Sequence, residues 1–239
     1  MKWSKSSHIG LVRKTNEDNC LVFEDLKLLA VADGMGGHQA GEVASRLALD
    51  TIAQFVRANS SEMVENPAGT LQKALEAANN KIYSRSREQS EYNGMGTTIT
   101  AACIKDDKVY LAHVGDSRAY LIHNGEIRLV TDDHSLVNEL VKNGGLSPDE
   151  ASRHPQRNVL TRAIGSMPLV EVDIYEEQVN SGDILLLCTD GLSGLLSLDE
   201  ISETVRGASS MEDGTGRLVE QALGRGGPDN ITVILCMIE

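Results

Sequence analysis

The sequence predicts an α+β protein in which antiparallel sheets are covered by helices. Short runs rich in Val, Ile, Leu and Thr follow one another along the chain and are separated by turn residues, as antiparallel strands are. Longer stretches with apolar residues at helical spacing are grouped between these runs. Because the helices do not alternate one by one with the strands, a βαβ series is disfavoured and an α+β architecture is favoured.

The predicted strands share a β-branched, apolar composition and bounding turn signals; they span residues 20–23, 28–32, 97–104, 108–114, 118–123, 127–131, 170–179, 183–188 and 231–238. The Asn124-Gly125 pair between two of them indicates a tight hairpin. Helical periodicity covers residues 40–57, 68–89, 198–206 and 214–223. Residues 132–165 contain only short apolar stubs with glycines and prolines, which indicates a mobile excursion from the core.

Composition limits the classes of protein that the chain could belong to. Its 239 residues suffice for one full core, and we expect a single domain over 1–239 with a flap at about 132–165. No apolar run is long enough to span a bilayer and no signal peptide is visible, so we expect a cytoplasmic protein without membrane contact. A net charge of −13 argues against nucleic acid as a partner.

The cysteines exclude one kind of phosphatase chemistry. The four lie far apart, and three of them stand inside strand-like runs, where a thiol behaves as a small buried hydrophobe. A cysteine-based phosphatase needs an arginine six residues after its nucleophile. Neither Cys20, Cys103 nor Cys188 has one there, so a thiolate phosphoenzyme is disfavoured.

Aspartates stand next to several predicted strands, and most of them adjoin glycine: Asp18, Asp33, Asp116, Asp190 and Asp229. Carboxylates gathered at the ends of core strands would repel one another unless a cation lies between them. Oxygen ligands without a Cys or His cluster favour Mg²⁺ or Mn²⁺ over zinc. Gly34, directly after Asp33, would let its backbone carbonyl approach an ion. One Asp-Gly pair is most often a turn, but agreement among five sites predicts a metal centre.

Six ordered motifs carry a resemblance to a known family: RKTNED at 13–18, VADGMGGH at 31–38, MGTT at 95–98, GDSR at 115–118, CTDGL at 188–192 and GPDNIT at 227–232. Together they resemble the metal-dependent serine/threonine protein phosphatases of type 2C, in particular a bacterial-type catalytic domain. The resemblance covers essentially the whole chain. It implies a four-layer α-β-β-α sandwich, in which two stacked antiparallel sheets are flanked by helices.

The resemblance also implies roles for individual residues. Asp33 would bridge two Mn²⁺ or Mg²⁺ ions, with the Gly34 carbonyl as a further ligand, and Asp190 and Asp229 would complete the set. Asp18 would orient metal-bound water. Two further roles concern residues outside this set: Asp116 would join Asp190 at a weaker third site, and Arg13 would grip the substrate phosphate, to which its forked guanidinium is suited.

The implied mechanism is attack of a metal-bridging hydroxide on the phosphorus of phosphoserine or phosphothreonine, without a covalent intermediate. Many eukaryotic relatives carry a histidine after the Asp-Gly pair that corresponds to Asp33-Gly34, as the acid for the leaving group. Here Met35 stands in that position, and its thioether cannot donate a proton. His38, three residues further on, is one candidate for the acid or for a water-orienting group, and a metal-bound water is the other.

The expected partners are phosphorylated proteins and a cognate Ser/Thr kinase that the enzyme would oppose in signalling, and we expect a monomer. Two other functions compete with this one. A metal-free pseudophosphatase that only binds phosphosites should have lost metal-binding aspartates, whereas Asp33, Asp190 and Asp229 are all present. A metal phosphodiesterase shares the two-cation chemistry, but such sites usually include histidine ligands.

Overall fold

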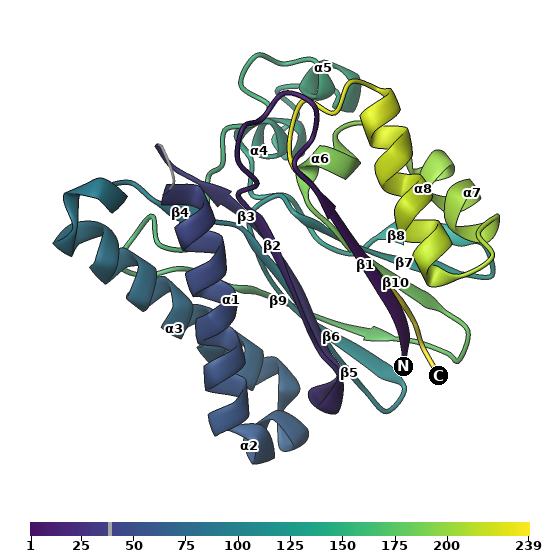
Figure 1. Ribbon diagram of the computed structural model, residues 1–239, viewed down its shortest axis with the longest axis horizontal. Coiled ribbons are helices and arrows are strands. Elements are labelled where there is room, and N and C mark those ends of the chain that lie inside the picture. Colours follow the sequence, from purple (N-terminus) through teal and green to yellow (C-terminus); the bar gives the residue numbers. More distant parts are fainter. Residues whose placement is uncertain (38–39) are drawn as a thin grey trace.

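Two stacked antiparallel sheets form the centre of the protein, and helices lie on both outer faces (Figure 1). The structure is a computed structural model, and it describes residues 1–37 and 40–239. The α+β class and the four-layer α-β-β-α sandwich predicted from the sequence are both confirmed.

The first sheet joins the two ends of the chain. Its strands lie in the order β1 (Lys2–His8), β11 (Ile231–Met237), β10 (Ile184–Cys188), β7 (Arg118–His123) and β8 (Glu126–Leu129). Strands β1 and β11 pair along their whole length. The predicted hairpin joins β7 to β8, and both residues of its turn, Asn124 and Gly125, have positive φ, as the two-residue turns of hairpins require.

The second sheet carries the strands that lead into the first aspartates. Its order is β2 (Asp18–Phe23), β3 (Leu28–Met35), β5 (Ile99–Lys105), β6 (Lys108–Val114) and β9 (Asp173–Gln178), with the short β4 (Gly96–Thr97) paired to the end of β3. In the β2–β3 ladder Asp18 lies directly opposite Asp33. The register of these two strands therefore fixes the Asp18 and Asp33 residues side by side.

The long helices cover the two outer faces. Helices α1 (Ala40–Ala58) and α3 (Pro67–Glu88) pack on the second sheet, with α2 (Ser60–Glu65) between them along the chain. Helices α7 (Leu198–Arg206) and α8 (Met211–Gly224) pack on the first sheet. Ser197 caps α7 in a capping box with Glu200, and Asn66 caps α3 ahead of Pro67, so each begins where its sequence gives a start signal.

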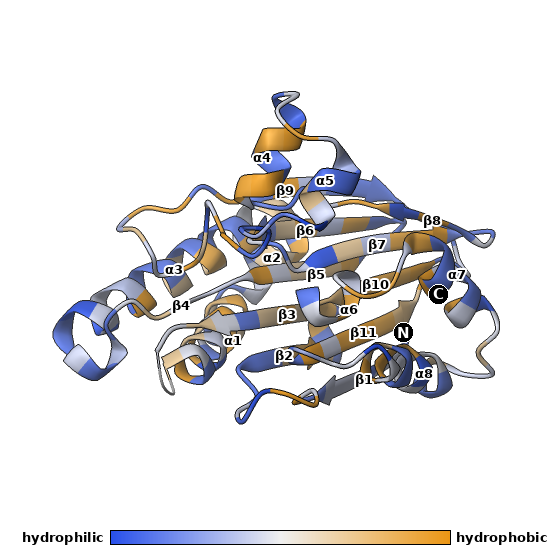
Figure 2. Cartoon of the chain, turned by 90° about the horizontal axis from the view of Figure 1, so that it is seen from above, coloured by the Kyte–Doolittle hydropathy of each residue, from blue (hydrophilic) through white to orange (hydrophobic). Residues whose placement is uncertain are grey.

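Alternation along the strands explains why there are four layers. On β3, Leu29 and Val31 face the other sheet, while Leu28 and Ala30 face the helices. Because successive side chains of a strand point to opposite faces, a strand that is apolar at every position must be covered on both sides. The same holds for β10. Leu185 and Leu187 pack in the core between the two sheets, whereas Leu186 and Cys188 pack against the helices. Figure 2 shows this as apolar strands in the middle of the molecule.

The segment 132–165, predicted as an excursion with only short apolar stubs, contains two short helices that the sequence did not indicate. It contains α4 (Leu136–Lys142) and α5 (Pro148–Ser152), which project above the sheets in Figure 2. Each begins at a serine whose side chain accepts a hydrogen bond from the first turn, Ser135 and Ser147. Helices this short lack the repeated apolar spacing that reveals longer ones, which is why the sequence did not indicate them.

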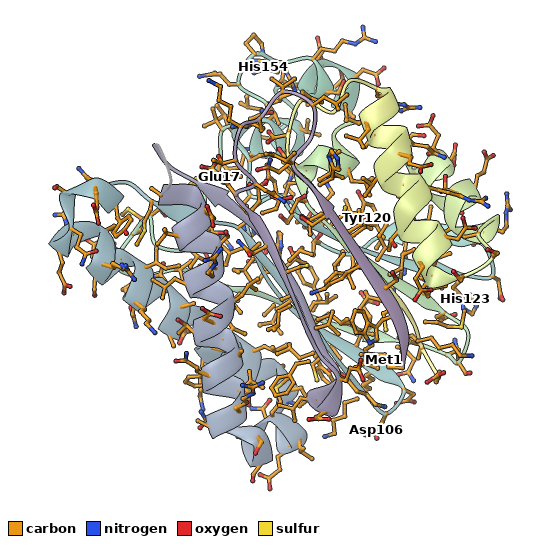
Figure 3. All side chains as sticks on the ribbon, in the orientation of Figure 1. Met1, Glu17, Asp106, Tyr120, His123 and His154 are labelled. Atoms are coloured by element: carbon orange, nitrogen blue, oxygen red, sulfur yellow. The ribbon has the colours of Figure 1, made fainter. Side chains whose placement is uncertain are left out.

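The candidate site lies at one end of the sandwich. In Figure 3, Glu17 marks this end, whereas Met1 and Asp106 lie at the other. In the described part of the chain the four cysteines are free, and Cys103, Cys188 and Cys236 are buried, as expected. Within residues 1–37 and 40–239, no helix is both long and apolar enough to cross a bilayer.

Candidate metal and phosphate site

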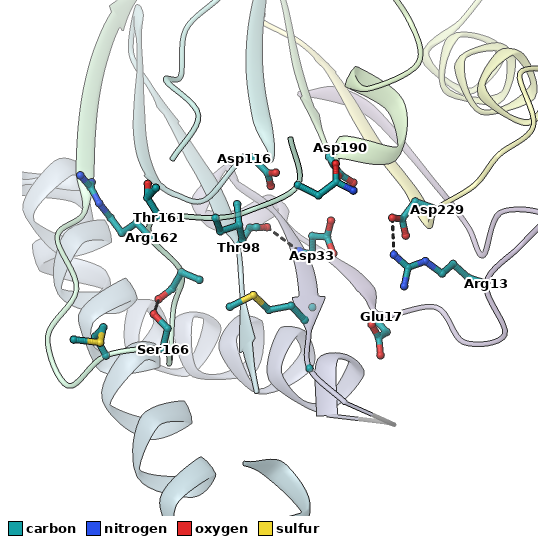
Figure 4. A pocket seen from close by; sticks show the side chains of 17 residues that line it. Arg13, Glu17, Asp33, Thr98, Asp116, Thr161, Arg162, Ser166, Asp190 and Asp229 are labelled. Carbon is teal, nitrogen blue, oxygen red and sulfur yellow. Dashed lines mark hydrogen bonds and ion pairs between the residues drawn. The ribbon is translucent and has the colours of Figure 1, made fainter. Parts of the chain in front are cut away.

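Four of the five aspartates line one cavity of about 490 Å³ at the ends of strands from both sheets (Figure 4). Asp33 lies near the end of β3, Asp116 in the β6–β7 turn, Asp190 at the start of α6 (Asp190–Ser193) and Asp229 just before β11. The fifth, Asp18, is buried behind them. Aspartates far apart in sequence therefore line one cavity.

Two glycines of the Asp-Gly motifs are needed for close backbone approach. A Cβ on Gly34 would lie 2.0 Å from the carbonyl oxygen of Gly41, and a Cβ on Gly191 would lie 1.9 Å from that of Asn230. Either contact is impossible without moving the backbone. The glycines that follow Asp33 and Asp190 therefore permit the packing of the strand ends that brings the carboxylates together.

Threonines of the core orient two of the aspartates. Thr98 Oγ1 accepts a hydrogen bond from the Asp33 backbone N–H at 2.9 Å and shares another with Ser117 at 2.8 Å. Thr189 Oγ1 donates to Asp18 Oδ2 at 2.8 Å and accepts from the Thr232 backbone N–H. The motifs contained these threonines, but no role was predicted for them, because a hydroxyl's partner depends on the strand register.

Asn230 holds the loop that carries Arg13. Its side-chain Nδ2 donates to the carbonyl oxygens of Ile9 and Thr15, at 2.9 and 3.0 Å, and its Oδ1 accepts from the Glu17 backbone N–H at 2.8 Å. Asn230 is buried, with only 4% of its surface exposed. One amide thus fixes both ends of the β1–β2 loop, a role that the sequence analysis missed.

The aspartates are placed where a negative charge is costly. Burial, reinforced by repulsion from neighbouring carboxylates, raises the pKa of Asp33 well above its usual value. The same two causes raise the pKa of Asp116 to about 8 and that of Asp190 to about 6. For Asp18 burial is also the main cause, and its pKa is about 7. A cation would remove this penalty.

Two buried carboxylate oxygens among the described residues have no hydrogen-bond partner: Asp18 Oδ1 and Asp190 Oδ1. Buried polar atoms are nearly always paired, so each of these calls for a partner that the chain itself does not supply. All the candidate donors are oxygens, the type that Mg²⁺ and Mn²⁺ prefer. The donor set therefore fits such an ion.

The side chains do not yet converge on one point. Within residues 1–37 and 40–239, no group of three or more His, Cys, Asp and Glu side chains is arranged so that it could hold a metal ion. Asp229 faces Arg13 and accepts a hydrogen bond from its Nη2 at 2.7 Å (Figure 4). In this structure the charge of Asp229 is therefore balanced by an arginine.

The wall of the cavity includes residues that the sequence analysis did not single out. Glu17 lines it near Arg13, and residues of 158–167 line the opposite side. The segment 132–165 is joined to the core by a bidentate pair between Arg118 and Asp133, with a shortest N–O distance of 2.7 Å. His38, the candidate acid, lies outside the described residues.

The family model for protein phosphatase 2C matches residues 7–225. The chain belongs to the protein phosphatase 2C family. It is 39% identical over 230 residues to a serine/threonine phosphatase of Listeria monocytogenes, covering 95% of this chain and 91% of that one. The predicted family and the predicted enzyme class, a protein serine/threonine phosphatase, are confirmed.

Solved structures of this family have the same fold. The serine/threonine phosphatase PstP of Mycobacterium tuberculosis matches with a TM-score of 0.91 and 38% identity, over all of this chain and 98% of that one. A PstP catalytic domain in complex with two manganese ions matches with a TM-score of 0.88 and 37% identity, over 98% of this chain and 96% of that one. That relative therefore binds manganese on a fold that it shares with this chain.

Proposed function

We propose that the chain removes phosphate from phosphoserine and phosphothreonine in proteins at the cavity between Arg13 and the aspartates. The observation that carries this proposal is the meeting of Asp33, Asp116, Asp190 and Asp229 around one cavity, next to an arginine. Clustered carboxylates alone would bind cations, whereas the guanidinium adds a group that recognises phosphate. Membership of the protein phosphatase 2C family supports the same reaction.

We assign two Mn²⁺ or Mg²⁺ ions to Asp33, the Gly34 carbonyl, Asp190 and Asp229, and a weaker third ion to Asp116 with Asp190. Such ions supply Lewis acidity, which lowers the pKa of water and neutralises phosphate oxygens. The unpartnered Oδ1 of Asp190 supports its place in this set. Asp18 lies opposite Asp33 and behind the cavity, as suits a residue that orients water without direct contact with substrate.

Arg13 has two roles in this proposal. In the structure it neutralises Asp229. Were Asp229 to serve as a metal ligand, the Arg13 guanidinium would be free of this pair, and its N–H groups would suit the phosphate oxygens of the substrate. The Arg13 side chain is half exposed, so it can make this movement at little steric cost.

The proposal includes a leaving-group acid, a flap, a source of the substrates and a cellular location. We assign the protonation of the leaving serine or threonine oxygen to His38, with a metal-bound water as the alternative. Residues 132–165 form a flap of a single domain, and the phosphoprotein substrates are made by a cognate Ser/Thr kinase. We further place the protein in the cytoplasm, as a monomer that binds neither membrane nor nucleic acid.

One experiment tests the reaction. The chain is incubated with a phosphothreonine peptide and Mn²⁺, with and without a chelator, and phosphate release is measured. We expect turnover that the chelator abolishes and that Asp33→Asn reduces by about 10³-fold or more, since loss of metal catalysis removes several kcal/mol. Binding of the peptide without turnover would instead support a pseudophosphatase, and turnover of a bis-ester alone would support a phosphodiesterase.

A further inference from the structure

A short loop that follows the segment 132–165 is held rigidly by a buried asparagine. This loop, residues 165–169, contacts Asn79 of α3, which is 1% exposed. Asn79 Oδ1 accepts from the Gly165 backbone N–H at 2.7 Å, and its Nδ2 donates to the Met167 carbonyl oxygen at 3.0 Å. Because a buried amide is costly unless fully bonded, this arrangement specifies one backbone conformation for the loop.

Two further features fix the start of the loop. Ile164 exchanges a pair of backbone hydrogen bonds with Thr97 of β4, at 2.9 and 3.0 Å. Gly165 has a φ of +85°, and a Cβ there would lie 2.1 Å from Ile82 Cγ2 of α3. The backbone is thus pressed against α3, at a position that only glycine allows.

The side chains of this rigid loop nevertheless face solvent. Met167 is 62% exposed and Leu169 is 85% exposed. Single exposed apolar residues are common and need no explanation. These two differ because their backbone is held in place by buried bonds, and because Ser166 and Met167 line the same cavity as the aspartates.

The loop that carries Arg13, which lines the cavity, also exposes apolar side chains. Leu11 and Val12, in the loop that carries Arg13, are 65% and 68% exposed. Leu11 is also held by its backbone, whose N–H donates to the Gly227 carbonyl oxygen at 2.8 Å. In Figure 4 the aspartates lie between Arg13 on one side and Ser166 on the other.

We propose that the 165–169 loop is a substrate-recognition element, in which Met167 and Leu169 contact an apolar side chain flanking the phosphoresidue of a protein substrate. The inference rests on the proposed function. The occupant is a substrate segment because the loop continues the wall of the catalytic cavity itself. Met167 and Leu169 would act on selectivity, while the aspartates act on every phosphate ester.

The test uses the double variant Met167→Ser, Leu169→Ser. Its matched control is Val64→Ser on α2, whose side chain is also exposed, at 58%, but does not line the cavity. Both variants are assayed with Mn²⁺ on phosphothreonine peptides in which a single leucine is moved through the positions on either side of the phosphothreonine. A leucine-free peptide and p-nitrophenyl phosphate are assayed in parallel.

We expect the parent and the Val64 control to prefer leucine at a position on one side. The double variant should lose about tenfold in kcat/KM on that peptide, mainly through KM, as loss of one apolar contact predicts. Its rates on the leucine-free peptide and on p-nitrophenyl phosphate should not change. This pattern would place the apolar contact at the loop.

Other outcomes overturn the inference. A double variant that keeps the leucine preference, or that loses activity equally on all substrates, shows that the loop does not recognise this side chain. A change in oligomeric state with an unchanged preference would assign the loop to contacts between copies of the chain. A parent protein that hydrolyses none of the substrates would overturn the proposed function itself. That result is seen with the parent alone, so it cannot be confused with a failure of the loop to recognise leucine.

Discussion

Arg13 and Asp229 form an ion pair at the mouth of the cavity, with Nη2 of Arg13 2.7 Å from Oδ2 of Asp229. Hydrogen bonding to Asp229 is the largest cause that raises the pKa of Arg13. In the proposed mechanism these two residues serve different species, the substrate and an ion. In that proposal the ion pair competes with both, because Asp229 would exchange Arg13 for an ion and Arg13 would exchange Asp229 for a phosphate group.

Replacing Arg13 should separate phosphate binding from ion binding. We expect Arg13→Ala to lower kcat/KM on a phosphothreonine peptide by about 10²-fold, as loss of one charged donor to a phosphoryl group does. The Mn²⁺ concentration for half-maximal activity should stay the same or fall, because Asp229 loses a competing cation. Initial rates over a Mn²⁺ titration measure both effects. The control is Lys14→Ala, an exposed neighbour, and a higher Mn²⁺ requirement in Arg13→Ala would contradict the assignment.

The buried aspartates should make the metal-free protein less stable as the pH rises. The pKa values of Asp190, Asp18 and Asp116 are about 6, 7 and 8, all above those of unfolded aspartates. Between these two sets of values the folded state binds more protons than the unfolded state. Stability therefore falls as the pH rises through the folded pKa values.

The measurement is urea unfolding in a chelator at pH 6.5 and at pH 8.5. We expect the free energy of unfolding to fall by about 1–3 kcal/mol over this range. Burial lowers the pKa of His113 to about 3, so an unfolded histidine, with a pKa of about 6.5, binds a proton that the folded one does not. This opposing difference in bound protons is large below pH 6.5 and has almost vanished by pH 8.5, so it removes only a few tenths of a kcal/mol from the expected fall. Added Mn²⁺ should raise stability most at pH 8.5. Equal stability at both pH values without metal would contradict the clustering of the charges.

Asn230 should act on catalysis through Arg13. We expect Asn230→Ala to remove three hydrogen bonds to the β1–β2 loop, lower the free energy of unfolding by about 1–3 kcal/mol and raise KM for a phosphopeptide. Because the loop carries Arg13, adding Arg13→Ala should have little further effect on KM. Such non-additivity is the sign that two residues act as a unit. Additive losses would show that Asn230 acts elsewhere, and Asn93→Ala, on an exposed residue, is the control.

The sequence predicted much of this protein because its signals are local. Residues 28–32 of β3 and all of β10 are apolar runs bounded by turn signals, and the turn at Asn124 and Gly125 follows from the two residues alone. Helix α7 was predicted with its bounds, because its apolar residues recur at helical spacing. The aspartates were found because carboxylates beside core strands contradict the ordinary preference for apolar cores.

Other features depend on contacts between distant residues. That Asn230 bonds to Ile9 and Thr15 follows only from the pairing of β1 with β11. The Arg13–Asp229 pair was not predicted, since the same arginine was assigned to phosphate. The flap helices α4 and α5 are too short to show a period. The motifs show where the site residues lie in the sequence, but these contacts can be seen only in the three-dimensional structure.

His38 should matter most for poor leaving groups, if it is the acid. We expect His38→Ala to slow hydrolysis of a phosphothreonine peptide far more than that of p-nitrophenyl phosphate, since nitrophenolate leaves without a proton. Rates of both substrates at saturating Mn²⁺ give the comparison. An equal loss on both substrates would assign the proton to a metal-bound water instead.

His134 ties the start of the flap to the turn that carries Asp116. Its Nδ1 accepts from the Gly115 backbone N–H at 3.0 Å, which leaves the proton on Nε2, and Nε2 donates to Asp173 Oδ2 at 3.1 Å. The His134 backbone N–H also donates to the Gly115 carbonyl oxygen at 2.7 Å. Only the two side-chain bonds are lost in His134→Ala.

We expect His134→Ala to lower the free energy of unfolding by about 1–3 kcal/mol, because a buried N–H of Gly115 and the Asp173 carboxylate lose a partner. Amide exchange over residues 132–165 should become faster, and the Mn²⁺ response attributed to Asp116 should weaken, while binding at the other aspartates persists. His154→Ala is the control, since that side chain bonds only to the nearby Gln156 N–H. If both variants exchange alike, the His134 contacts do not hold the flap to the Asp116 turn.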